Sequence, residues 1–167
     1  MTDHYRRRWV GLVFISVAVS LIIVDSTIVN VAVPSIVEDL GISSTEVQWV
    51  QEAYTLVFAS LLLLFGSLAD RFGRKRLMLV GVVVFAGSSV LAALAPTGEL
   101  LILARLVQGV GGAMILPTTL SVINATFRGR ERGIAFAVWG STIGGMAAVG
   151  PLLGGWLTTD FSWRWAP

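Results

Sequence analysis

The stretch GSLADRFGRKR, which runs from Gly66 to Arg76, separates two predominantly apolar segments of the chain. It contains Asp70 and several basic side chains, whereas the segments on either side, residues 47–68 and 77–95, contain few charges. A helix that crosses the hydrocarbon core of a bilayer needs about 20 predominantly apolar residues. The pattern therefore predicts a short charged turn between two membrane-spanning helices.

Further apolar segments of similar length flank this pair in the sequence. The connections between them are short and either polar or marked by proline and glycine, which is typical of turns. We therefore expect an all-α integral membrane protein with five transmembrane helices, forming one helix bundle over residues 1–167. The predicted spans are residues 9–33, 47–68, 77–95, 100–123 and 133–157.

The composition excludes several other classes of protein. Of the 167 residues, 55% are hydrophobic and 13% are charged, whereas a soluble domain carries about 25% charged residues. This charge is too low for a compact soluble enzyme, and the apolar content is too high for a disordered chain. The chain has no cysteine and one histidine, His4. A disulfide framework, a Cys/His metal site and a histidine-based catalytic triad are therefore excluded.

Basic residues gather at the N-terminus and in the turns after the second and fourth predicted spans. They are Arg6, Arg7 and Arg8, then Arg71, Arg74, Lys75 and Arg76, then Arg128, Arg130 and Arg132. Cytoplasmic loops are enriched in Lys and Arg, so the N-terminus should be cytoplasmic and the C-terminus external. These loops could also bind anionic lipid or nucleic acid. Their confinement to short turns favours topology signalling and argues against a nucleic-acid partner.

The arginines at the N-terminus also fit the start of a secretory signal peptide. The apolar run after them is longer than such peptides have, and no convincing cleavage site follows it. We therefore expect an uncleaved first helix in a multi-pass protein of the cytoplasmic membrane.

Ionisable residues within the predicted spans are the first candidates for a functional site. At about 1.5 Å per residue, Asp25 lies roughly 24 Å above the cytoplasmic start of its helix, and Arg105 lies roughly 8 Å below the outer edge. Glu52 falls in the same outer layer. Buried charges in a membrane are costly unless they are paired or hydrated, so the three residues predict a shared, water-accessible polar site. In the alternative, Asp25 or Glu52 reaches the outer interface and Arg105 forms a structural ion pair.

Small residues predict where helices approach closely or reverse. Gly140, Gly144 and Ala148 recur at helical spacing in the fifth span and would lie on one packed face. In the turn after the second span, Gly66 would permit close packing and Gly73 a tight reversal. There Asp70 could accept hydrogen bonds from Arg71, from Arg74 or from helix-terminal amides. We expect this turn to act as a charged latch.

The chain resembles the N-terminal part of a major facilitator superfamily transporter, and in particular the fourteen-helix drug:proton antiporters. Residues 25–34 are similar to the first-helix motif of these antiporters, and residues 66–75 to the signature loop between the second and third helices. Residues 101–113 and 150–155 resemble the fourth-helix motif and the antiporter motif of the fifth helix. Residues 161–165 resemble the family's link into its sixth helix.

The resemblance implies a role for each matched residue. Arg105 would assist proton coupling, Asp25 would lie in the cation and proton path, and Glu52 matches more loosely an acidic residue of some relatives. The cytoplasmic gating loop would consist of Gly66, Asp70, Arg71, Gly73 and Arg74. The antiporter motif would consist of Gly150, Pro151, Gly154 and Gly155, which shape the fifth helix.

The family fold has two six-helix halves, whereas this sequence supplies five spans, without the sixth helix and the second half. We therefore expect a segment of a proton-coupled exporter of lipophilic, cationic drugs that does not transport alone. We expect no cofactor or metal, and the proton gradient would supply the energy. The P-loop pattern of nucleotide-binding proteins is absent, which argues against ATP as the energy source. The alternative is a truncated membrane protein that does not transport but associates with other helices or with a complementary transporter fragment.

Overall fold

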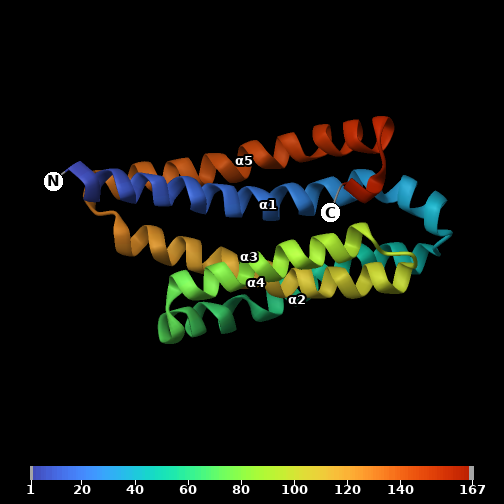
Figure 1. Cartoon of the computed structure of the whole chain (residues 1–167), viewed down its shortest axis with the longest axis horizontal. Helices are drawn as coiled ribbons and strands as arrows, with labels where there is room; N and C mark the ends of the chain where they lie inside the picture. Colours follow the sequence, from blue (N-terminus) through green and yellow to red (C-terminus); the bar gives the residue numbers. More distant parts are fainter. Residues whose placement is uncertain (1, 166–167) are drawn as a thin grey trace.

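The computed structural model describes residues 2–165, with side chains from Tyr5 onward, so His4 is described by its backbone alone. Five long helices make up the fold (Figure 1), and each is long and apolar enough to cross a membrane. The helices are α1 (Thr2–Leu40), α2 (Ser44–Phe72), α3 (Arg74–Ala93), α4 (Gly98–Thr126) and α5 (Gly129–Asp160), followed by a short 3-10 helix, η1 (Trp163–Trp165). This confirms the predicted all-α membrane fold with five spans.

The helices extend beyond the predicted spans, because polar residues continue the helices past the apolar segments. Only the third helix stops early, at Ala93 instead of residue 95. The start of α2 is set by a capping box, in which Ser43 and Glu46 exchange hydrogen bonds between side chain and backbone. Between α2 and α3, Gly73 adopts φ 100°, a conformation that favours glycine. The expected tight reversal is therefore present.

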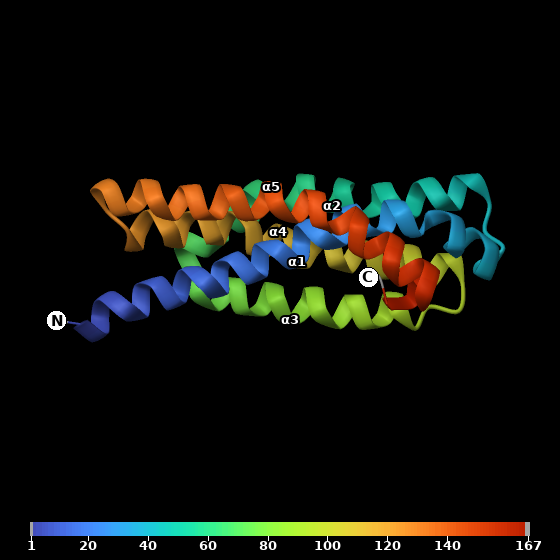
Figure 2. The same cartoon turned by 90° about the horizontal axis from the view of Figure 1, so that it is seen from above.

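The helices form two groups that lie against each other (Figures 1 and 2). Helices α1 and α5 run side by side, and α4 packs most extensively against α2 and α3. The beginning of α1, the α2–α3 turn and the α4–α5 turn all lie at one end of the molecule, on the left in Figure 1. The three basic stretches therefore share one end, as the charge rule requires of a cytoplasmic side.

At the opposite end of the bundle, Arg164 of η1 forms hydrogen bonds with residues at the ends of α1 and α3. Its guanidinium donates to Asp39 Oδ2 at 3.0 Å and to the carbonyl oxygens of Ala93 and Ala95 at 3.2 and 2.9 Å. Asp39 Oδ2 also accepts a hydrogen bond from Trp163 Nε1 at 3.0 Å. This cluster ties the end of α5 to the ends of α1 and α3.

The packed face of α5 is not the predicted one. Gly140 and Gly144 have no neighbouring atom near the position of a Cβ, and Ala148 is exposed. Close packing occurs instead at Gly150 and Gly154, which lie against α1. The spacing of Gly140 and Gly144 indicates a helix face without bulky side chains. However, α5 contacts α1 through the face that carries Gly150 and Gly154.

Candidate functional site

A buried ion pair joins the first and fourth helices where the sequence places its intramembrane charges. Arg105 Nη1 lies 2.7 Å from Asp25 Oδ2. Asp25 is 4% exposed and Arg105 is 2% exposed, so the pair is almost completely buried. The two residues that the sequence places at the same depth are therefore in direct contact.

Gln108 completes this pair as a bridge between the two charges. One turn after Arg105 on α4, it accepts a hydrogen bond from Arg105 Nη1 at 2.7 Å through Oε1. Its Nε2 donates to Asp25 Oδ1 at 3.0 Å and to Ser89 Oγ of α3 at 2.8 Å. The resulting network links α1, α3 and α4.

The second helix closes the site from the other side. Arg105 Nε donates to the carbonyl oxygen of Val50 at 3.2 Å, and its guanidinium lies over the ring of Tyr54, 4.5 Å from the centroid. A cation above an aromatic face is stabilised by the quadrupole of the ring. The Tyr54 hydroxyl is buried and has no hydrogen-bond partner among the described residues.

A small polar pocket of about 100 Å³ reaches the arginine side of the pair. Its walls include Tyr54, Arg105, Asn30 and Gln51, and Gln51 Nε2 donates to Asn30 Oδ1 at 3.0 Å. Polar pockets of this size have room for a few water molecules. The arrangement can therefore bring water to the guanidinium without fully exposing the carboxylate.

Glu52, the third predicted member of the site, does not join the pair. Its side chain is exposed, whereas Val50, Ala53 and Tyr54 form the buried face of α2. At 100° per residue, position 52 points away from that face. Position along the helix therefore predicted the contact between Asp25 and Arg105, but it wrongly placed Glu52 in the same site.

The cytoplasmic turn contains the predicted contact between Asp70 and Arg74. Arg74 Nε and Nη2 donate to Asp70 Oδ1 at 3.0 and 2.8 Å, and Arg74 Nη1 donates to the carbonyl oxygen of Ser121 in α4 at 2.9 Å. Arg71 instead lies over the ring of Phe72. Gly66 lies against Pro117 of α4, whose Cβ would be 3.7 Å from an added Cβ. The turn is thus joined to α4 mainly through Arg74.

Replacing Arg74 with glutamine should lower the free energy of unfolding by about 1 kcal/mol. The change removes one partly buried hydrogen bond to Ser121 and one exposed ion pair, and the exposed pair contributes little. Arg76→Gln is the matched control, because Arg76 is exposed and surface substitutions usually stay within about 0.5 kcal/mol. Thermal unfolding in detergent, followed by circular dichroism, measures both. Equal losses in the two variants would contradict this role of Arg74.

The predicted motif of α5 is divided between a packed and an open side. Gly150 and Gly154 are buried against α1, where added Cβ atoms would meet Thr27 and Ile28. Gly155 has open space at its Cβ position, and Pro151 is exposed within the helix. The two buried glycines let α5 approach the segment of α1 that carries Asp25.

Comparison with known proteins agrees with this architecture. The family model described as "Major Facilitator Superfamily" matches residues 2–167. The chain is 51% identical over 160 residues to the puromycin resistance protein pur8 of Streptomyces alboniger, covering 95% of this chain and 32% of that protein. It is 45% identical over 158 residues to the multidrug efflux pump LfrA of Mycolicibacterium smegmatis, covering 94% and 31%. With the lincomycin resistance protein of Streptomyces lincolnensis, identity is 44% over 165 residues, covering 96% and 33%. The chain thus spans about a third of the length of these curated relatives.

Proposed function

The chain belongs to the major facilitator superfamily and is a multi-pass protein of the cell membrane, and from this premise we propose that it is part of a proton-coupled drug exporter. The observation that carries the proposal is the buried Asp25–Arg105 pair. Intramembrane ionisable groups commonly mark proton and ion pathways. The relatives include a multidrug efflux pump and antibiotic resistance proteins, which supports a drug as the substrate.

The chemistry of the pair suggests how a proton could drive release of a cationic drug. When Asp25 is ionised, its charge balances that of Arg105. A proton on Asp25 cancels the carboxylate charge and leaves the guanidinium uncompensated, because arginine does not lose its proton in proteins. The site then carries a net positive charge that repels a cationic substrate. This exchange requires no metal, nucleotide or covalent intermediate.

The network around the pair would transmit the protonation to the helices. Gln108 donates to Asp25 and to Ser89, and Arg105 donates to the backbone of α2 at Val50. Loss of the ionic contact would therefore alter the hydrogen bonds that hold α1, α2 and α3 to α4. We propose that this repacking is coupled to movement at the cytoplasmic turn of Asp70 and Arg74, which lies at the other end of α2.

A chimera tests this function. Residues of the S. alboniger puromycin resistance protein that align with this chain are replaced by the chain itself, and efflux of a fluorescent lipophilic cation is measured in membrane vesicles with an imposed proton gradient. The unaltered chimera should export the cation, and Asp25→Asn should reduce gradient-driven export to the background of empty vesicles. The chain expressed alone should give no export, because substrate sites in this fold lie between two halves.

Glu52→Gln in the same chimera is the matched control, since it neutralises a carboxylate of similar depth that does not contact Arg105. It should retain export while Asp25→Asn does not. Unchanged gradient-driven export by the Asp25→Asn chimera would overturn the proton-coupling role. Export by the chain alone would show that it acts without the rest of a transporter, whereas a chimera that is stable in the membrane but never exports would support the alternative of a non-transporting membrane protein.

A further inference from the structure

The side-chain amide of Gln108 is completely buried, and each of its polar atoms is in use. The residue is 0% exposed. Its Nε2 donates to Asp25 Oδ1 and to Ser89 Oγ, and its Oε1 accepts from Arg105 Nη1. An amide nitrogen carries two hydrogens, so both donors are occupied. Gln108 thus has no spare donor with which to meet a change in either charged neighbour.

The chemistry of the two charged neighbours fixes which way this amide faces. A guanidinium has donors only and requires the amide oxygen, whereas an ionised carboxylate has acceptors only and requires the amide nitrogen. Gln108 satisfies both at once, at 2.7 Å from Arg105 Nη1 and 3.0 Å from Asp25 Oδ1. The opposite orientation would set two donors against each other at Arg105 and two acceptors at Asp25. The amide as it lies therefore matches the ionised state of Asp25.

A proton on Asp25 reverses this requirement. The two side chains that hydrogen-bond to Asp25 within residues 5–165 are Arg105 and Gln108, and both are donors. A protonated carboxyl group would therefore have a buried O–H without an acceptor, which is costly. Rotating the amide so that Oε1 and Nε2 exchange places supplies that acceptor. Ser89 tolerates the rotation because a hydroxyl can donate as well as accept, but Arg105 loses its acceptor and meets Nε2 instead.

The backbone around Gln108 leaves side-chain rotation as the available response. An added Cβ at Gly109 would lie 2.7 Å from the carbonyl oxygen of Tyr54 on α2, and one at Gly111 would lie 2.7 Å from the backbone nitrogen of Phe85 on α3. Helix α4 is therefore held tightly between α2 and α3 at this level. Rotation about the last torsion of a glutamine side chain needs no backbone movement, and that torsion has a broad, two-fold preference.

The charged and titratable groups of the described residues that lie around Asp25 are few. Arg105 of α4 is paired with it, and Tyr54 of α2 lies against the guanidinium. Glu52 of α2 is exposed and points away from this site. Helix α3 contributes Ser89, which does not ionise, and α5 approaches this part of α1 through glycines. The response to a proton on Asp25 therefore falls on Arg105 and on the amide between them.

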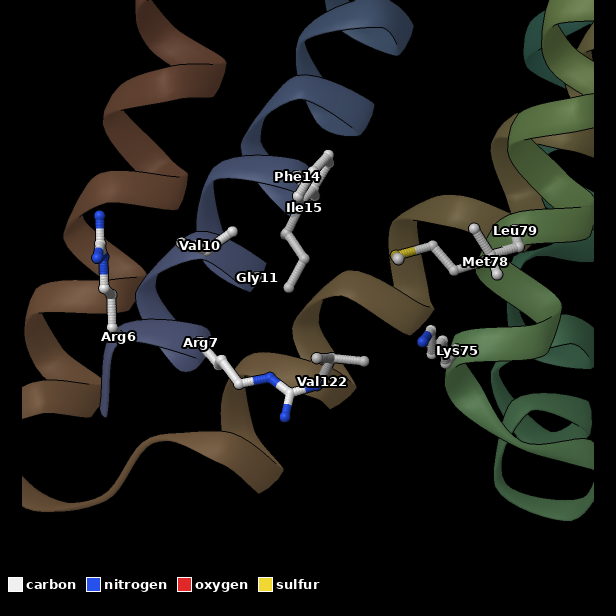
Figure 3. A pocket seen from close by; sticks show the side chains of 10 residues that line it. All are labelled: Arg6, Arg7, Val10, Gly11, Phe14, Ile15, Lys75, Met78, Leu79 and Val122. Atoms are coloured by element: carbon white, nitrogen blue, oxygen red, sulfur yellow. The ribbon is translucent and has the colours of Figure 1, made fainter. Parts of the chain in front are cut away.

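The remaining cations of α1 and α3 are far from this network. Arg6, Arg7 and Lys75 line a cavity at the cytoplasmic end of the bundle (Figure 3). Arg7 is about five helical turns from Asp25 along α1, and the interaction between charges weakens with distance. These cations do not replace Arg105 as a partner of Asp25.

We propose that Gln108 is a positioning residue whose amide rotates when Asp25 takes up a proton, and that this rotation releases Arg105 from α1. The proposal rests on the proton-coupling role of Asp25 proposed above. In the ionised state Gln108 holds the guanidinium against the carboxylate. In the protonated state Oε1 accepts from Asp25, and the guanidinium keeps its contacts with Val50 and Tyr54 of α2. Protonation thus changes which helices are joined, because Arg105 stays with α2 and leaves α1.

NMR of the purified 167-residue chain tests this rotation without any transport. The sequence contains three glutamines, Gln48, Gln51 and Gln108, so isotope labelling of glutamine gives few side-chain amide signals, and Gln108→Met assigns the relevant pair. In the parent chain at neutral pH, the amide hydrogens of Gln108 should show a nuclear Overhauser contact with the side chain of Ser89. In Asp25→Asn this contact should disappear, because the amide oxygen then faces that side.

Asp25→Asn is the informative variant because asparagine is neutral and offers both a donor and an acceptor, as a protonated carboxyl group does. Gln51 is the internal control, since its Nε2 donates to Asn30 and that contact should persist in Asp25→Asn. Circular dichroism establishes that the variant keeps its helix content. Persistence of the contact between Gln108 and Ser89 in Asp25→Asn would overturn the proposal. Loss of the Gln51 contact as well would also count against it, since the whole bundle would then be disturbed.

The chimera described above shows whether the rotation couples export to the proton gradient. Exchange of labelled for unlabelled cation across vesicles without a gradient needs no change in protonation. Gln108→Met should therefore reduce gradient-driven export about tenfold more than exchange, the effect of one hydrogen bond to a charged group. Gln48→Met is the matched control, since it makes the same change at an exposed position and should affect both activities equally. Equal reduction of the two activities by Gln108→Met would leave the residue a structural role only and overturn the proposal. A chimera without any export would refute the proposed function, while the NMR comparison would still decide the rotation.

Discussion

Replacing Asp25 with alanine should lower the free energy of unfolding by about 3–5 kcal/mol, the usual cost of breaking a buried ion pair by removal of one partner. The change leaves the guanidinium of Arg105 buried at 2% exposure. Its remaining contacts are Gln108 Oε1, the carbonyl oxygen of Val50 and the ring of Tyr54. None of these supplies a negative charge, and arginine cannot discard its own charge.

The reciprocal change, Arg105→Met, should cost less, about 1–3 kcal/mol. A carboxyl group without its partner can take up a proton and become neutral, and Gln108 would still donate to Asp25. The double variant Asp25→Ala with Arg105→Met should be more stable than Asp25→Ala alone, because replacing both members of a buried pair by apolar groups is often close to neutral. Denaturation in mixed detergent micelles, followed by circular dichroism, gives the coupling energy. Simple addition of the two single losses would mean that the pair contributes no coupling energy.

The depth of a charge in the membrane could be predicted from the sequence, but its direction could not. Counting residues along the two spans placed Asp25 and Arg105 in one layer, and the structure joins them at 2.7 Å. The same counting failed for Glu52, because depth does not state which way a side chain points. Among the buried positions of α2, Val50, Ala53 and Tyr54 define its inner face at the level of the pair, and counting residues along the span does not identify that face.

The partners of the pair were the part that sequence reasoning missed. Gln108 follows Arg105 by one helical turn, so its spacing could have marked it as a neighbour on the same face. Ser89 had no such signal, because its contact with Gln108 depends on how α3 crosses α4. Tyr54 likewise reaches Arg105 only through the packing of α2. Contacts between helices follow from the crossing geometry, which a single sequence does not contain.

Glycines illustrate the same limit for the fold. The tight reversal at Gly73 could be predicted because it is a local property of one turn. The face of α5 that packs could not, since Gly140 and Gly144 have the same spacing as a contact face but lie in open space. On α4, added Cβ atoms at Gly109 and Gly111 would lie 2.7 Å from backbone atoms of α2 and α3. The sequence showed these glycines only as members of the motif at residues 101–113.

Substituting Gly111 with alanine should destabilise the protein by about 3 kcal/mol, in the upper range for overpacking of a tight core. A Cβ at this position would lie 2.7 Å from the backbone nitrogen of Phe85 and 3.0 Å from the carbonyl oxygen of Gly81, both on α3. Backbone atoms cannot rotate away, so α3 must move from α4. Ser89 follows Phe85 by one turn of α3, and its hydrogen bond with Gln108 should lengthen or break as a result. The loss therefore includes part of the candidate site and not only helix packing.

Two glycine-to-alanine controls separate this steric cause from a general effect of the substitution. Gly112→Ala, on the same helix, would meet the side chains of Phe58 and Tyr54 at 3.1 Å, which can shift, so its loss should be smaller. Gly144→Ala enters open space on α5 and should be neutral or stabilising by up to about 1 kcal/mol, since alanine favours helix more than glycine. Thermal unfolding of the three variants in one detergent measures this order. If Gly111→Ala unfolded no more easily than Gly144→Ala, the close contact of α3 with α4 would not exist, and the position of Ser89 beside Gln108 would lose its support.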